Sequence, residues 1–158
     1  MKKIVSTLFG LIFLFSINLN AEEKLTIEKQ LVGIVGAISG TVKTETRELK
    51  AGDQIYLNET IFAGPGAGTQ ILLLDQSTFT VGEDSEVVMD TFVFDPETND
   101  GKIVASVKQG SLKVISGLIS KKNPDSLTVE VPEGTLGSRG TEFQTIVSKG
   151  KTDTLLIG

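Results

Sequence analysis

The sequence predicts an all-β fold, built as a single domain of short strands. Glycine, threonine, valine and isoleucine are plentiful, and long helix-forming runs are few. From Leu31 onwards, short apolar runs recur between turn signals, at the spacing typical of a sandwich, a barrel or a solenoid. With 158 residues the chain is long enough for one domain that has its own core.

Residues 1–21 have the layout of a secretory signal. Two lysines precede an apolar stretch from Ile4 to Ile17, and the more polar segment that follows ends at the small residue Ala21. The apolar stretch is shorter than the ~20 residues that a membrane-spanning helix needs. We expect cleavage after Ala21, which leaves no stable membrane span. The alternative is an uncleaved anchor, because Leu19 is not the small residue that cleavage favours two positions earlier.

A polar lead-in, residues 22–30, is expected to precede the β domain, residues 31–158. The expected strands of this domain are apolar runs bounded by turn-forming residues. They are Leu31–Gly36, Ile38–Val42, Leu49–Leu57 with a turn at Gly52-Asp53, Thr60–Ala63, Thr69–Leu74, Thr78–Val81, Val87–Phe94, Ile103–Val107, Leu112–Ile115, Val129–Val131 and Glu142–Val147. We expect the first two to pair with each other, Gln109–Ser111 to form a turn, and Ser116–Asp125 to be a basic loop.

The last apolar run, Leu155–Gly158, has no polar cap. A strand of this kind leaves an edge unpaired or poorly covered. Either a neighbouring strand covers this edge, or the natural chain continues; the sequence leaves both alternatives open.

The acidic stretch from Asp95 to Gly101 superficially resembles a calcium-binding loop. In that register glycine is required where Asp100 stands, and no glutamate follows at the right distance. Asn99, Asp100 and Gly101 are instead typical of a hairpin connection. We therefore expect a hairpin whose return strand begins near Ile103.

The composition excludes several classes of function. The chain has no histidine, cysteine or tryptophan, which rules out Ser–His and Cys–His nucleophile pairs, zinc sites built on His or Cys, and disulfides. The formal net charge of -5 argues against nucleic-acid binding, which needs a cationic surface. We expect no cofactor and no metal.

The remaining candidates for catalysis have structural interpretations that we favour. The acidic cluster Glu83–Glu86 could supply a general acid and base, but it stands at a turn between strands, where solvated charges are common. Ser111 and Lys113 would share one face of a strand, yet nothing nearby indicates the burial that a Ser–Lys dyad requires. The glycines of Gly64–Gly68 lack the Gly-Lys-Ser/Thr ending of a phosphate loop. We expect the protein not to be an enzyme.

Arg139 is the side chain most specifically placed by its neighbours, because it stands between Gly137 and Gly140 in a corner between two strands. One interpretation is an internal tie, in which the guanidinium bonds backbone carbonyls or a carboxylate such as Glu133 or Glu142. The other is an anchor for a partner's carboxylate. We favour the internal tie.

A series of short motifs runs through most of the chain after residue 31. They are Gly33-x-Val35 with Gly40-x-Val42, Leu49-x-x-Gly52-Asp53-x-Ile55, Ile61-x-Ala63-Gly64, Leu74-Asp75-x-Ser77-x-Phe79-x-Val81-Gly82, and Pro132-x-Gly134 leading to Arg139-Gly140-Thr141-x-Phe143. In their order and ending they resemble the FecR-domain family. The resemblance implies a domain of solenoid-like character in the periplasm or outside the cell, so we expect a twisted fold that is β-solenoid-like or sandwich-like. Arg139, Gly140, Thr141 and Phe143 form the candidate structural or interaction motif.

In the regulators that give this family its name, the domain belongs to a membrane-spanning sensor. It passes a signal from an outer-membrane, TonB-dependent receptor to a cytoplasmic sigma factor. The present sequence departs from that plan, because it has no cytoplasmic anti-sigma segment and no internal transmembrane helix. It also has Gln76 where such domains usually have glycine.

Taken together, these patterns predict an exported, non-catalytic FecR-like domain, periplasmic or secreted, that acts as a protein-interaction or signalling module at the cell envelope. Exposed strand edges offer a means, the addition of a strand from an envelope protein partner. The alternative is a cell-wall or carbohydrate-binding module, and a carboxylate-based hydrolase is a third class. One tyrosine and no tryptophan leave few rings on which sugars could stack, which favours protein binding. The sequence assigns neither the partner's identity nor the oligomeric state.

Overall fold

The computed structural model describes residues 28–137, 142–148 and 151–157. The elements within these ranges are almost all strands, which confirms the all-β single domain. They are β1 (Leu31–Ser39), β2 (Val42–Lys43), β3 (Gln54–Tyr56), β4 (Thr60–Ala63), β5 (Gly68–Leu73), β6 (Thr78–Val81), β7 (Ser85–Phe94), β8 (Gly101–Ile115), α1 (Leu118–Lys122), a 3-10 helix (Pro124–Ser126), β9 (Leu127–Val131), β10 (Gly134–Gly137), β11 (Glu142–Ser148) and β12 (Lys151–Leu156).

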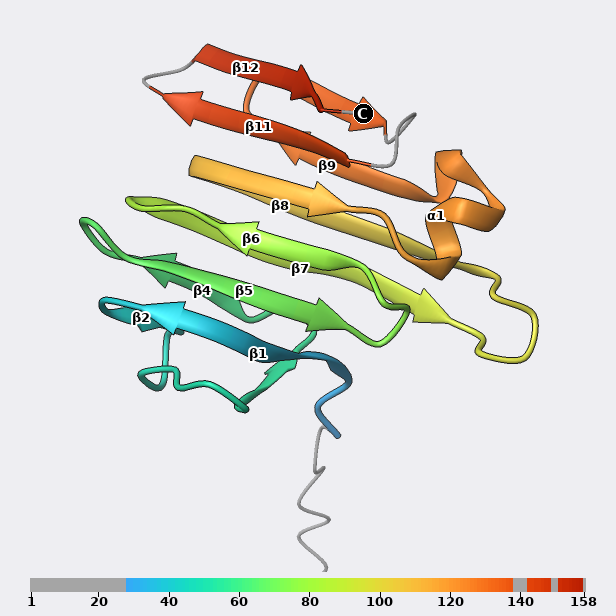
Figure 1. The fold of residues 1–158 in the computed structure, drawn as a ribbon, viewed down its shortest axis with the longest axis horizontal. Coiled ribbons are helices and arrows are strands. Elements are labelled where there is room, and N and C mark those ends of the chain that lie inside the picture. Colours follow the sequence, from blue (N-terminus) through green and yellow to red (C-terminus); the bar gives the residue numbers. More distant parts are fainter. Residues whose placement is uncertain (1–27, 138–141, 149–150, 158) are drawn as a thin grey trace, which may run out of the picture.

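The strands form one curled sheet that folds over on itself into two layers (Figure 1). We call layer A the series β3, β1, β5, β6, the second half of β8, β11 and β12. Layer B is the series β2, β4, β7, the first half of β8, β9 and β10. All these pairs are antiparallel except β8 with β9. The arrangement agrees with the expected solenoid-like or sandwich-like character.

The long strand β8 belongs to both layers. Its first part pairs with β7 and β9, and its part after Gln109 pairs with β6 and β11. The strand changes layer at Gly110, whose φ of 84° is unfavourable for other residues. A Cβ atom there would lie 2.1 Å from Oγ of Ser85. That hydroxyl accepts a hydrogen bond from the backbone N–H of Ser111 (2.9 Å) and donates one to the carbonyl of Glu83 (3.0 Å).

Two of the expected breaks in the chain were wrong. Gln109–Ser111 is not a turn between two strands, because β8 bends there without ending. Leu31–Gly36 and Ile38–Val42 do not pair with each other, since β1 continues through Gly36 and pairs with β3 and β5. The register with β5 shifts between Val35 and Ala37, so Gly36 is the extra residue of a β-bulge.

The expected hairpin between Asp95 and Gly101 is confirmed. β7 and β8 pair as far as Phe94 and Gly101, and Asn99 has the positive φ of a tight connection (59°). The expected loop after β8 instead contains α1 and the 3-10 helix. Lys122 of α1 forms an ion pair with Asp100 (2.7 Å), and this contact lowers the pKa of the Asp100 carboxyl.

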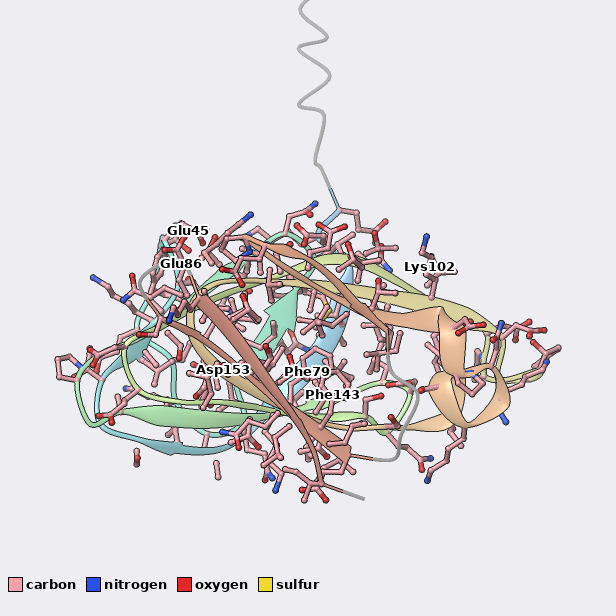
Figure 2. All side chains as sticks on the ribbon, turned by 90° about the horizontal axis from the view of Figure 1, so that it is seen from above. Glu45, Phe79, Glu86, Lys102, Phe143 and Asp153 are labelled. Atoms are coloured by element: carbon pink, nitrogen blue, oxygen red, sulfur yellow. The ribbon has the colours of Figure 1, made fainter. Side chains whose placement is uncertain are left out.

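Apolar side chains from both layers fill the space between them. Phe79 of layer A is 1% exposed and Ile103 of layer B is fully buried. Phe143 also points inward, and Figure 2 shows Phe79 and Phe143 between the two layers. The alternate residues of β11 face outward, and one of them, Ile146, is 45% exposed.

A buried turn between β5 and β6 holds α1 against the sheet. The carboxylate of Asp75, which is fully buried, accepts hydrogen bonds from the backbone N–H (3.0 Å) and hydroxyl (2.9 Å) of Ser77 and from the N–H of Ile119 (3.4 Å). The carbonyl of Asp75 accepts from the N–H of Leu118 (2.7 Å), and the Ser77 hydroxyl accepts from the N–H of Gly117 (3.0 Å). The turn therefore binds the first amides of α1 and fixes where the chain leaves β8.

This contact also explains the glycine at position 117 and the conformation of Gln76. A Cβ atom on Gly117 would lie 2.3 Å from the carbonyl oxygen of Asp75, so only glycine allows the approach. Gln76, which stands where the family usually has glycine, adopts a φ of 69°. Its N–H still donates to the carbonyl of Leu73 (3.0 Å), so the turn forms despite the departure.

We expect Gly110→Ala to destabilise the domain by about 3 kcal/mol, because the new methyl group adds a steric clash to an unfavourable φ. Gly52→Ala is the matched control, since Gly52 has a similar φ (89°) and no atom within 4 Å of its Cβ position. It should cost about 1 kcal/mol. Urea unfolding measures both changes. Equal costs would show that the bend in β8 is not tightly packed.

We expect Asp75→Ala to destabilise the domain by about 3 kcal/mol, because it leaves buried N–H donors without an acceptor. The control is Asp53→Ala. Asp53 also accepts a backbone N–H, from Lys50 (2.8 Å), but in an exposed turn, so its loss should cost about 1 kcal/mol or less. Thermal unfolding of the two variants tests the difference. A milder effect at Asp75 than at Asp53 would contradict the account of the α1 contact.

Candidate functional site

The two layers end together at β10 and β12, at the end of the molecule opposite β1 and β2 (Figure 1). In the part of the chain that the structure describes, β12 pairs with β11 on one side and with no strand on the other. β10 likewise pairs only with β9 there. This end is therefore where a strand could be added.

The ladder between β11 and β12 determines which backbone groups of β12 face the open edge. The N–H of Ile157 donates to the carbonyl of Glu142 (3.1 Å), so Ile157 turns its backbone groups towards β11. Backbone groups alternate in direction along an antiparallel strand. Thr152, Thr154 and Leu156 therefore turn their N–H and C=O groups towards the open edge.

One of these groups is already bound within the domain. The carboxylate of Glu133, in the turn between β9 and β10, accepts a hydrogen bond from the N–H of Thr152 (2.9 Å). No other described residue bonds the edge-facing groups of Thr154 and Leu156. The first half of β12 is thus closed by layer B, and the second half is open.

A groove lies beside the open half, between the two layers. We call it the end groove, and its volume is about 380 Å³. The described residues that line it come from β10, β11 and β12, and they are Thr135, Leu136, Gly137, Phe143, Thr154 and Leu156. Leu156 shares the inward face of layer A with Phe143, yet it is 65% exposed, whereas Phe143 is 2% exposed. The apolar interior is therefore open to solvent at this end.

The outer face of β12 changes character along the strand. Lys151 and Asp153 are charged and exposed, a pattern that protects edge strands against unwanted pairing. Leu155 and Ile157, further along the same face, are 63% and 44% exposed. Asp153, labelled in Figure 2, has no ion-pair partner among the described side chains. The open half of β12 thus carries aliphatic side chains on both faces.

The site predicted from the sequence overlaps this region only in part. Arg139, Gly140 and Thr141 lie outside the described residues, so both interpretations of Arg139 stay predictions. Phe143 is a core residue whose Cα partners are Val114 and Leu156.

The two carboxylates considered as partners of Arg139 have other contacts. Glu133 binds the N–H of Thr152, and Glu142 forms an ion pair with Lys113. Sequence reasoning missed the contact between Glu133 and Thr152, which joins residues 19 positions apart. The apolar run Leu155–Gly158 was the signal for an unpaired or poorly covered edge in this region, although the sequence left open whether another strand covers it.

Two of the catalytic candidates, Glu83 and Lys113, have structural contacts. The carboxylate of Glu83 accepts from the N–H of Gly66 (2.9 Å) and so joins the corner between β6 and β7 to the turn between β4 and β5. Lys113 is half exposed and bound to Glu142 on the next strand. Within the described ranges there is no group of three acidic, His or Cys residues that could hold a metal ion.

None of the helices in the described part of the chain is long and apolar enough to cross a membrane.

Comparison with protein families finds one match, to the family described as FecR protein, over residues 59–157. Neither the curated proteins nor the solved structures contain a match. The matched span takes in the buried turn at Asp75, the whole of β8 and the end groove. It covers well over half of the chain, and the chain therefore belongs to the FecR family, a signalling-related family associated with the cell envelope.

Proposed function

We propose that the chain is an exported, non-catalytic module that binds an envelope protein by taking up a strand of that partner along β12. The observation that carries this proposal is the open half of β12. There the edge-facing backbone groups of Thr154 and Leu156 are unpaired among the described residues, beside exposed leucines. Backbone pairing of this kind supplies affinity, and neighbouring pockets supply specificity.

The size of this edge favours a reversible interaction. An added strand could form only a few backbone hydrogen bonds, each with a net contribution of about 1 kcal/mol. Burial of Leu155 and Leu156 would add about 2 kcal/mol each. The loss of freedom on association opposes these terms. A weak, reversible complex suits a signalling domain better than a permanent assembly.

The contacts of two catalytic candidates support a non-catalytic role. Glu83 and Lys113 are both engaged in bonds that hold the sheet together. The secretory layout of residues 1–21 supports export to the periplasm or beyond the cell. Family membership supports signalling as the purpose of the interaction.

A cell-wall or carbohydrate-binding module is the alternative. Such modules commonly present aromatic rings to sugars, and this chain has a single tyrosine. The ring of Tyr56 is approached by the cationic groups of Lys29 (5.6 Å) and Arg47 (5.7 Å). These contacts compete with a sugar for the ring, which favours the protein-binding proposal.

Thr154→Pro tests the proposed edge. The N–H of Thr154 points away from β11, so proline removes no backbone hydrogen bond among the described residues, only the contact between the Thr154 and Thr145 hydroxyls (3.4 Å), and it blocks an incoming strand. We expect an envelope protein captured by the wild-type chain to be retained at least ten-fold less by this variant. The melting temperature should change by only about 2–3 °C, the size of a mild surface substitution.

Ile34→Lys is the matched control, because Ile34 is 41% exposed on the outer face of β1, far from β12 in the strand order. It should capture the protein normally. Unchanged capture by Thr154→Pro would refute the edge as the binding site. Sedimentation of the chain with purified peptidoglycan would support the carbohydrate alternative, and turnover abolished by Glu83→Gln would support a hydrolase.

A further inference from the structure

We infer that the end groove selects the partner segment by its side chains, and that the segment is extended, antiparallel to β12, aliphatic opposite Leu156 and basic opposite Asp153. This inference rests on the proposed function and adds to it the chemistry of the partner. It follows from the register that the open edge allows, the lining of the groove and the charge beside it.

The open backbone groups define the register. In an antiparallel ladder, residues opposite each other either exchange both backbone hydrogen bonds or none. Among the described residues, only Thr154 and Leu156 leave both their N–H and their C=O unpaired at this edge, since Glu133 occupies the N–H of Thr152. We therefore name four partner positions in their chain order, with a opposite Leu156, b opposite Leu155, c opposite Thr154 and d opposite Asp153. Positions a and c exchange the hydrogen bonds.

Positions a and c also direct their side chains inward, because residues opposite each other share a face of the sheet. There they meet the end groove, whose apolar surface is formed by Leu136, Phe143 and the 65%-exposed Leu156. An aliphatic side chain at a would cover Leu156 and continue the core by one strand. A polar side chain there would be buried without a partner, which is unfavourable.

Positions b and d lie on the outer face. Position b lies opposite Leu155, which is 63% exposed, so an aliphatic residue there buries more apolar surface. Position d lies opposite Asp153, whose carboxylate is exposed and lacks an ion-pair partner among the described side chains. Opposite charges facing each other across strands stabilise the pair, so d should be lysine or arginine. Lys151, two residues before Asp153 on this face, disfavours further basic residues beyond d.

Charge complementarity distinguishes this segment from a second copy of the chain. Two copies of β12 could pair antiparallel about Leu155, with Thr154 opposite Leu156 of the other copy. In that register Asp153 would lie opposite the apolar Ile157 of the other copy, and neither carboxylate would gain a cationic partner. A segment with a basic residue at d complements both the apolar inward face of the open edge and the charge of Asp153 on its outer face. A second copy of the chain complements only the apolar inward face.

Peptide binding to the full chain tests the inference. The probe is a fluorescently labelled peptide with Leu, Ile, Val and Lys at a, b, c and d, flanked by Gly-Ser. We expect saturable binding that weakens about five-fold when the lysine becomes glutamate. In Asp153→Lys the preference between these two peptides should invert. Leu→Ser at a should weaken binding about ten-fold. N-methylation at a or c should abolish binding, and N-methylation at b should not.

Each contrary result has a separate meaning. Absence of peptide binding, with capture of the envelope protein still sensitive to Thr154→Pro, would overturn the inferred sequence pattern and leave the proposed edge intact. Equal effects of N-methylation at a and b would overturn the register. Self-association of the chain that Thr154→Pro abolishes, without peptide binding, would assign the edge to a second copy. Capture that ignores Thr154→Pro would remove the proposed function itself.

Discussion

The sharing of β8 between the two layers is the constraint on which the rest of the structure depends. One continuous strand pairs with β7 and β9 before Gly110 and with β6 and β11 after it. The core is enclosed because the sheet folds over along this strand, and the bend is possible because Gly110 packs directly against Ser85. The contact of the Asp75 turn with Gly117 then directs the chain out of β8 and back towards β9 in layer B.

The folding of the sheet along β8 also leaves one end of the molecule with open edges. A curled sheet that grows outward from a shared strand must stop somewhere, and it leaves edges where it stops. At the β10 and β12 end, the contact between Glu133 and Thr152 joins the two layers and closes half of the edge. The other half keeps aliphatic side chains on both faces, including Leu156, which belongs to the inward face but is largely exposed. The account of function depends on this combination of a closed half and an open half.

Local patterns predicted much of the fold. The run Glu142–Val147 was expected as a strand and is β11, and the turn residues of Asp95–Gly101 predicted a hairpin that the structure contains. Glycine was a less certain guide, because it marks a turn, a bulge and a bend alike. Gly36 was therefore wrongly interpreted as a break between two paired strands, whereas it is a bulge within β1. Gly110 was wrongly interpreted as part of a turn, whereas it is a bend within β8. The helix α1 escaped prediction because its five residues are held by the distant Asp75 turn and not by their own periodicity.

The candidate site was harder to predict than the fold. The apolar run Leu155–Gly158 indicated an unpaired or poorly covered edge, but which half of β12 is closed depends on a contact between two separate hairpins. Amide hydrogen exchange measured by NMR tests the central claim directly. In the isolated chain we predict slow exchange at Asp153 and Leu155, moderate protection at Thr152, and fast exchange at Thr154 and Leu156. A bound partner should protect the last two. Protection of Thr154 and Leu156 in the isolated chain, or fast exchange of both in the complex, would contradict the account.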